Sequence, residues 1–159
     1  PHAQGARLVP RAELTGAPGP RGVGGDAARP CLPALAMYKH YVSRMTETPP
    51  LSPYLTVHDA RAAIAFYRRA FGAELLGEQP TPDGAKLIHA ALRLNGATVM
   101  LSDDFPEMTG ASRTPKALGG TPVTIHLDLP DVDAAWRRAV EAGAVVVMPL
   151  ADQFWGDRY

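Results

Sequence analysis

Apolar and polar positions follow the same pattern at two places in the chain. Residues 53–72 (PYLTVHDARAAIAFYRRAFG) begin with alternating apolar positions, continue through an Asp into an amphipathic stretch, and end at a Gly. Residues 122–143 (PVTIHLDLPDVDAAWRRAVEAG) repeat this order, and the repeat pairs Asp59 with Asp131. A strand–helix unit that occurs twice indicates a fold built from two similar modules.

The first of these stretches predicts a strand followed by a helix. Residues 54–57 alternate in polarity, as a half-buried strand does. Asp59 has the side chain and position of a helix N-cap, and Gly72 suits the left-handed residue that ends many helices. Apolar residues from Ile64 to Phe71 recur at helical spacing and predict a stripe that packs on the core.

Three further strands are predicted after this helix, at residues 73–78, 86–94 and 97–102. Asn95-Gly96 joins the last two as the commonest two-residue hairpin turn. The first module, residues 51–105, is therefore predicted to have the order β-α-β-β-β.

One face of this predicted sheet is apolar and suits packing against the helix. The other face is mixed in character, so it is either solvated or lines a cavity beneath a second sheet. Its residues are Ser52, Tyr54, Thr56, His89, Arg93, Thr98, Met100 and Ser102.

The second module is predicted at residues 121–159, after a connector at 106–120 with the character of a crossover or lid. It begins with a strand at 121–129, in which Thr124 and His126 point away from the following helix. A continuous apolar strand is predicted at 144–150. Only one full strand fits after the helix, so we expect the second module to be truncated and the chain to be a fragment.

Residues 1–50 differ in composition from the rest of the chain. They contain eight Pro and six Gly without apolar periodicity, and such a segment buries too little surface to offset the entropy of ordering. We interpret it as a disordered tail or upstream translated sequence, with Met37 or Met45 as candidate start residues. A functional N-terminal arm is the less favoured alternative.

Charge and cysteine content exclude several classes of protein. The formal net charge is zero, because residues 1–50 carry +3 (six basic, three acidic) and residues 51–159 carry −3 (ten basic, thirteen acidic). An acidic folded part argues against nucleic-acid binding. The apolar runs are too short to predict a membrane span. The single cysteine, Cys31, allows no disulfide framework, and this fits a cytoplasmic protein.

Several motifs together resemble one known family. These are AIAFYRRAFGAE, the Asn-Gly hairpin before VMLSD, GGTPVTIHL, DVDAAWRRAVEAGA and ADQFWGDRY. Residues 51–159 resemble the vicinal oxygen chelate superfamily, which includes glyoxalase I, extradiol dioxygenases and bleomycin resistance proteins, and most of all its PhnB-like branch. The resemblance implies an α+β fold in which two β-α-β-β-β modules form a half-open mixed barrel, here with a truncated second module.

The resemblance also implies where a divalent metal would bind. Its ligand positions correspond to Ser52, Thr124 and Met100, with a fourth beyond Tyr159. Hydroxyl and thioether groups are poor ligands for zinc, nickel or iron(II). We therefore predict no inherited metal site and no cofactor. A rearranged metal site at the histidines below is a second hypothesis.

Two histidines are the candidate catalytic residues, His126 and His89, because imidazole acts as a general base near neutral pH. Hydrogen-bonding residues of a pocket are the alternative interpretation of both. The resemblance implies Arg158 as an anion contact, with Phe154 and Trp155 either at the pocket mouth or sealing the end of the core. The predicted substrate-binding residues are Tyr54, Met100, Thr124, His126, Phe154, Trp155 and Arg158.

The favoured function is a small-molecule binding protein of the glyoxalase/bleomycin-resistance type without the usual divalent metal. The alternative is a metal-dependent or His-based lyase, isomerase or dioxygenase of the same superfamily. The expected partners are a small-molecule ligand and a second copy in a homodimer, with no nucleic acid and no membrane.

Overall fold

The computed structural model describes residues 8–10 and 51–159. The prediction of a tail at 1–50 therefore lies outside the described residues, apart from a short strand at its start. The elements are β1 (Leu8–Pro10), β2 (Tyr54–Val57), α2 (Ala60–Phe71), β3 (Glu74–Pro80), β4 (Leu87–Leu94), β5 (Ala97–Asp103), α3 (Pro106–Thr109), α4 (Pro115–Leu118), α5 (Val132–Glu141) and β6 (Ala144–Val146).

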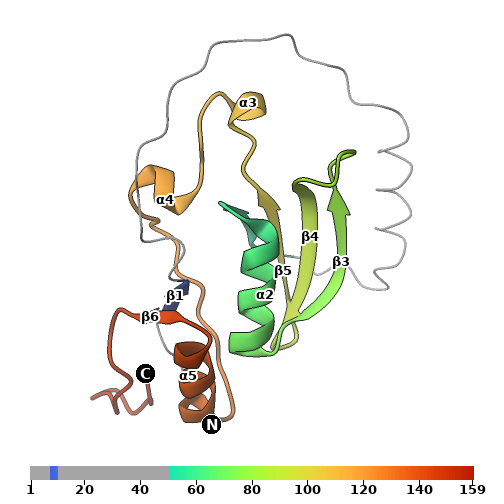
Figure 1. Cartoon of the computed structure of the whole chain (residues 1–159). Helices are drawn as coiled ribbons and strands as arrows, with labels where there is room; N and C mark the ends of the chain where they lie inside the picture. Colours follow the sequence, from blue (N-terminus) through green and yellow to red (C-terminus); the bar gives the residue numbers. More distant parts are fainter. Residues whose placement is uncertain (1–7, 11–50) are drawn as a thin grey trace.

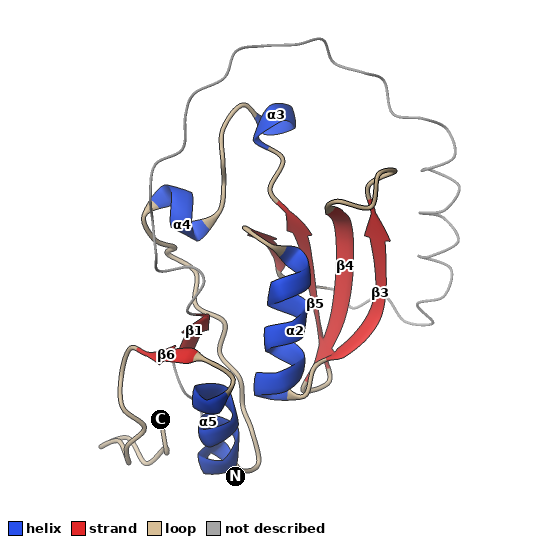
Figure 2. Ribbon diagram, in the orientation of Figure 1, coloured by secondary structure: helices blue, strands red, loops and turns tan. Residues whose placement is uncertain are grey.

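The first module has the predicted order β-α-β-β-β. Its strands form an open mixed sheet in the order β2-β5-β4-β3. Strand β2 runs parallel to β5, whereas β5 with β4 and β4 with β3 are antiparallel. Helix α2 lies across one face of this sheet (Figures 1 and 2).

Local signals in the sequence set the ends of these elements. The Asp59 carboxylate accepts a hydrogen bond from the Ala62 backbone N–H at 2.9 Å, which caps α2. Gly72 ends the helix with φ 68°. Asn95 and Gly96 both have positive φ, 47° and 81°, as a tight hairpin turn requires.

The core lies between α2 and the sheet. Ile64 of α2 packs against the apolar face of the strands, where Leu92 and Leu101 are fully buried. This is the face that the alternation predicts, with one exception. Ile88 is exposed and Leu87 is buried, because the β3–β4 register shifts at this point and leaves Ile88 as the extra residue of a bulge.

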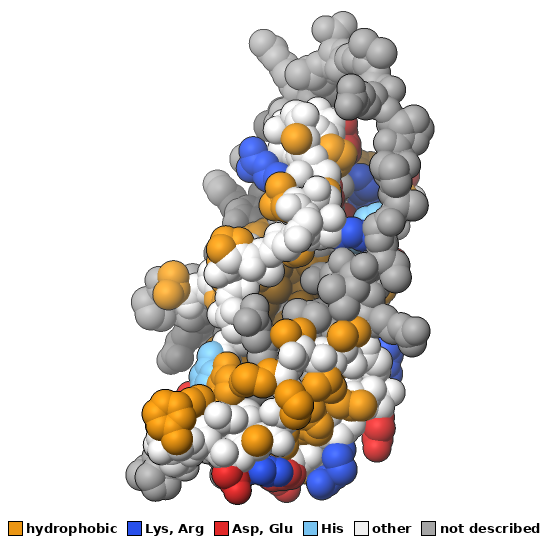
Figure 3. Space-filling view, turned by 90° about the vertical axis from the view of Figure 1, so that its left-hand side faces the viewer, with side chains coloured by type: hydrophobic (Ala, Val, Ile, Leu, Met, Phe, Trp, Pro, Cys, Tyr) orange, Lys and Arg blue, Asp and Glu red, His pale blue; other side chains and the backbone are white. Residues whose placement is uncertain are grey.

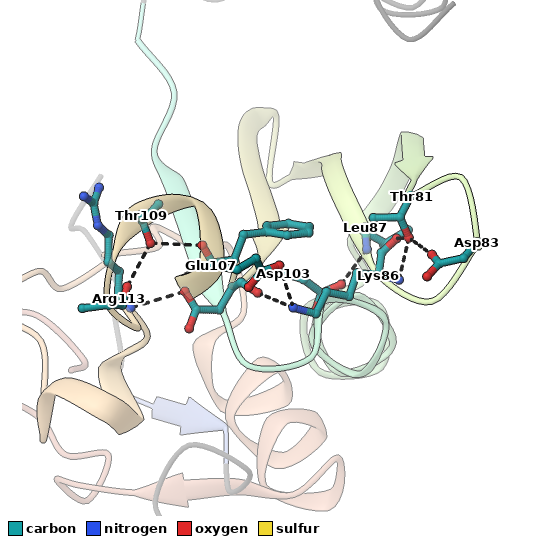
Figure 4. Close-up of polar contacts among 11 residues, drawn as sticks. Thr81, Asp83, Lys86, Leu87, Asp103, Glu107, Thr109 and Arg113 are labelled. Carbon is teal, nitrogen blue, oxygen red and sulfur yellow. Dashed lines mark hydrogen bonds and ion pairs between the residues drawn. The ribbon is translucent and has the colours of Figure 1, made fainter. Parts of the chain in front are cut away.

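Asp103 ties three elements of the first module together at the end of the sheet. Its carboxylate accepts hydrogen bonds from the Ala60 N–H at 2.8 Å and the Leu87 N–H at 2.6 Å. The last residue of β5 thereby holds the first residues of α2 and β4, as Figure 4 shows for Leu87. Buried backbone donors need such partners, because an unsatisfied one is costly.

Lys86 attaches the connector to this same end of the sheet. Its ammonium group donates to the Asp104 carbonyl at 2.8 Å and lies 3.7 Å from the Glu107 carboxylate (Figure 4). It also lies 4.8 Å from the centroid of the Phe105 ring, in a cation–π contact. The connector contains two single-turn helices, α3 and α4, in place of one irregular loop.

The predicted strand at 121–129 is wrong. This segment belongs to no strand of the structure, and most of its residues are exposed. Leu127 packs against the first-module core, and the Asn95 amide donates to the Asp128 carbonyl. An alternating sequence forms a strand only beside a pairing partner, and no described segment pairs with this one.

Helix α5 follows its sequence signals more closely. The Asp131 carboxylate caps it by accepting from the Ala134 N–H at 2.9 Å. Its Ala139 packs against Phe66 and Ala70 of α2, so the two helices touch. None of the described helices combines the length and apolar character needed to cross a bilayer.

The predicted strand at 144–150 is shorter in the structure. Only Ala144–Val146 is a strand, β6, and it pairs antiparallel with β1. Apolar side chains of this half of the molecule remain exposed and gather on the lower part of the face in Figure 3. The exposed large apolar residues of this half include Val123, Val140, Val146, Val147, Phe154 and Trp155.

Candidate functional site

The candidate site is the sheet face that points away from α2. Residues that pair directly across a sheet point to the same side, so the register arranges this face in rows. Tyr54 pairs with Met100, which pairs with Ala91, in a central row. Thr98 pairs with Arg93 in a neighbouring row towards one end of the sheet.

A hydrogen bond between Tyr54 and His89 is the most specific feature of this face. The Tyr54 hydroxyl lies 2.9 Å from His89 Nδ1, and the ring centroids are 5.5 Å apart. The hydroxyl also lies 3.3 Å from the Ile88 carbonyl, to which it can only donate. The two side chains come from β2 and β4 and meet over the intervening strand β5.

Burial controls the protonation of His89. The residue is 7% exposed, while Tyr54 is 52% exposed. Burial lowers the pKa of the His89 imidazole below its usual 6.5, because the charged form loses solvation. His89 is therefore neutral at pH 7, with one ring nitrogen that donates and one that accepts.

We expect the imidazole of His89 to titrate with a midpoint below 6.5. The His89 ring takes up a proton at a lower pH in the folded protein than in the unfolded chain. The neutral ring therefore contributes to the stability of the fold above pH 6.5, and this contribution is lost as the pH falls through the folded pKa. NMR of the ring nitrogens across pH 4–8 would measure the midpoint. A His89 midpoint at or above 6.5 would contradict this prediction.

The other candidate residues gather near the C-terminus. His126 stacks on Tyr159 with ring centroids 5.6 Å apart, and its Nε2 lies 3.1 Å from Asp128 Oδ1. Trp155 contacts both Tyr159 and Phe154 edge to face. Among the described contacts, none joins this group to the Tyr54–His89 pair.

The predicted placement of Thr124 and His126 on a sheet face is wrong, because their segment forms no strand. Both residues are exposed. The repeat places Tyr54 and His126 at equivalent positions, but the structure joins Tyr54 to His89. The sequence names both members of that pair without linking them, because their contact depends on the strand order.

Arg158 is engaged by two carboxylates. It donates to both oxygens of Asp133 at 3.1 and 2.8 Å and to Asp152 at 3.1 Å. The hydrogen bond from Arg158 lowers the pKa of the Asp133 carboxyl, and both acids raise the pKa of the guanidinium. In this arrangement Arg158 holds the C-terminal segment against α5, and an anionic ligand would have to compete with two acids.

Comparison with known proteins identifies the family. The model of the Glyoxalase/Bleomycin resistance protein/Dioxygenase superfamily matches residues 40–159. The chain belongs to this superfamily.

Two mycobacterial proteins are similar in sequence to this chain. Mb0911c of Mycobacterium bovis is 64% identical over 112 residues, which are 70% of this chain and 73% of that protein. Rv0887c of Mycobacterium tuberculosis has the same identity over 112 residues, but these span only 65% of its length. Among solved structures, TioX from Micromonospora sp. ML1 has 29% identity and a TM-score of 0.48, covering 69% of this chain and 84% of TioX.

The metal positions of the glyoxalase superfamily do not suit a divalent ion in this chain. The Ser52 hydroxyl is buried and has no hydrogen-bond partner among the described residues, but a neutral hydroxyl is a weak ligand. Met100 offers a thioether, which prefers softer metals, and Thr124 lies outside any strand. Within the described residues, no three His, Cys, Asp or Glu side chains are grouped so as to hold an ion.

Proposed function

We propose that this protein binds a small organic molecule on the sheet face opposite α2, without a divalent metal at Ser52, Met100 and Thr124. The hydrogen-bonded Tyr54–His89 pair is the observation that carries the proposal. It presents a half-exposed aromatic ring with a fixed hydroxyl beside the partly exposed thioether of Met100. Such a surface suits an apolar or aromatic ligand with a polar group.

The wider architecture belongs to this proposal. In a half-open barrel of two β-α-β-β-β modules, a second sheet would cover the face that carries Tyr54 and bring the C-terminal candidates towards it. The Thr124–His126 segment, Phe154, Trp155 and Arg158 would then line the same pocket. A PhnB-like affiliation, a homodimer and a cytoplasmic location complete the proposed description, with neither nucleic acid nor membrane as a partner.

A His-based lyase or isomerase is the second candidate, and one observation favours it. The lowered pKa of His89 keeps a neutral imidazole at pH 7, which is the form that removes a proton from a substrate. The Tyr54 hydroxyl at Nδ1 would orient the ring. Metal-dependent lyase or dioxygenase chemistry would need ligands other than those at the inherited positions.

Thermal-shift screening of aromatic metabolites is the experiment that tests this proposal. We expect a ligand that raises the melting temperature of the full chain equally with and without EDTA. Tyr54→Phe removes one hydrogen-bonding hydroxyl, so ligand affinity should fall about two- to twelvefold. His89→Ala should weaken binding further, because it also removes the partner that fixes Tyr54.

The matched control is His58→Ala, since His58 is an exposed histidine outside this face. It should bind ligand like the wild type. Loss of the ligand shift with EDTA would overturn the metal-free proposal, and unchanged binding in both Tyr54→Phe and His89→Ala would overturn the site. Turnover of the bound compound that is lost only in His89→Ala would select the lyase or isomerase.

A further inference from the structure

Arg93 is a cation on the proposed binding face. It lies on β4 between Leu92 and Leu94, both of which are buried against α2, so its own side chain points to the opposite face. Tyr54 and Met100 occupy that same face. Arg93 is exposed, and none of the ion pairs among the described residues involves it.

The register places Arg93 at a distance from the Tyr54–His89 pair that one small ligand could span. Arg93 is two residues along β4 from Ala91, which belongs to the row of Tyr54 and Met100. Strand spacing and rise put the Cα atoms of Tyr54 and Arg93 about 12 Å apart. Thr98, paired directly with Arg93, lies on the same face between them and is buried.

These positions divide the face into three chemical zones. One end offers the Tyr54 hydroxyl, the middle offers the Met100 side chain, and the other end offers the Arg93 guanidinium. Arginine recognises carboxylate and phosphate groups through paired hydrogen bonds. An apolar molecule with an anionic group at one end and a polar group at the other would satisfy all three zones.

We propose that the ligand of this face is an organic anion, with its charged group at Arg93 and its apolar body across Met100 towards Tyr54. The inference rests on the proposed function and adds the charge of the ligand. Glu74 is the nearby opposing group, since it pairs with Arg93 across β3 and β4. Its carboxylate lowers the local positive potential, so removing it should strengthen binding of the anion.

Two bicyclic probes of matched shape test this inference by calorimetric titration of the full chain. The first is 6-hydroxy-2-naphthoate, and the second is 2,6-dihydroxynaphthalene, which replaces the carboxylate with a neutral hydroxyl. We expect the naphthoate to bind about tenfold more tightly or better, as a charge-assisted hydrogen bond does over a neutral one. Added salt should reduce this preference, because Arg93 is exposed.

Variants of the face assign the preference to Arg93. Arg93→Gln should remove the preference by weakening binding of the naphthoate far more than binding of the neutral probe, while Arg93→Lys should keep part of the preference. Glu74→Gln should increase the affinity for the naphthoate. Arg68→Gln changes an exposed arginine on α2, on the other side of the sheet, and should have no effect.

The outcomes separate this inference from the proposed function. Equal binding of both probes to the wild type, or a preference that survives in Arg93→Gln, would overturn the inference that the ligand is an anion. The proposed site would then bind a neutral ligand. Binding of neither probe would also overturn the inference, and the thermal-shift screen would then decide the proposed function by itself.

Discussion

Replacing Asp103 with Ala should lower the free energy of unfolding by about 2–6 kcal/mol. The Asp103 carboxylate accepts from the backbone N–H groups of Ala60 and Leu87, and both of those residues are fully buried. The substitution leaves two buried donors without partners, and each costs about 1–3 kcal/mol. It also releases the junction between β5, α2 and β4, and His89 lies only two residues beyond Leu87.

Denaturant unfolding followed by circular dichroism would measure this loss. Asp103→Asn is the conservative variant, since its amide oxygen can still accept from one donor and should restore part of the stability. Asp157→Ala is the matched control, because that side chain makes none of the described hydrogen bonds or ion pairs. Substitutions of ordinary surface residues usually change stability by less than about 0.5 kcal/mol. If the free energy of unfolding of Asp103→Ala differed from the wild type by no more than this, the role of the carboxylate would be refuted.

Leu101→Ala should lower the free energy of unfolding by about 2–5 kcal/mol, as large-to-small changes in well-packed cores do. Leu101 has no exposed surface and belongs to the core cluster between the sheet and α2. Its neighbour Met100 points to the opposite face and is partly exposed. Met100→Ala should therefore lower the free energy of unfolding less than Leu101→Ala does. It should weaken ligand binding more than Leu101→Ala does.

The same denaturant experiment, paired with ligand titration, would test this division between the two faces of β5. We expect Leu101→Ala to retain its ligand affinity at a temperature where it is folded. If Met100→Ala proved the more destabilising of the two, the assignment of core and binding faces would be wrong.

Much of the first module is predictable from its sequence, because its signals are local. Asp59 and Gly72 mark the two ends of α2 through capping chemistry and left-handed backbone geometry. The Asn95-Gly96 turn specifies the β4–β5 hairpin, and neighbouring strands then pair with little loop entropy. Alternation assigned Met100 and Arg93 to the face opposite α2 correctly.

Other features depend on how distant segments meet. Alternation alone places Ile88 in the core, but the bulge opposite β3 exposes it and buries Leu87. The sequence of residues 121–129 alternates as clearly as that of β2, yet no described segment offers it hydrogen bonds. From the sequence alone, Arg158 is predicted to be available for an anion. In the folded structure Asp133 lies beside it and accepts its hydrogen bond.

The sequence by itself thus determined the first strand–helix unit, the helix of the second, the Asp caps of both helices, the family and the residue types of the candidate face. Periodicity and capping act over a few residues, so local sequence is enough to specify them. Only the tertiary structure decided that Tyr54 meets His89, since this contact requires β5 to lie between β2 and β4. It also decided that His89 is buried and neutral, because desolvation is a property of the surroundings of a side chain and not of its neighbours in sequence.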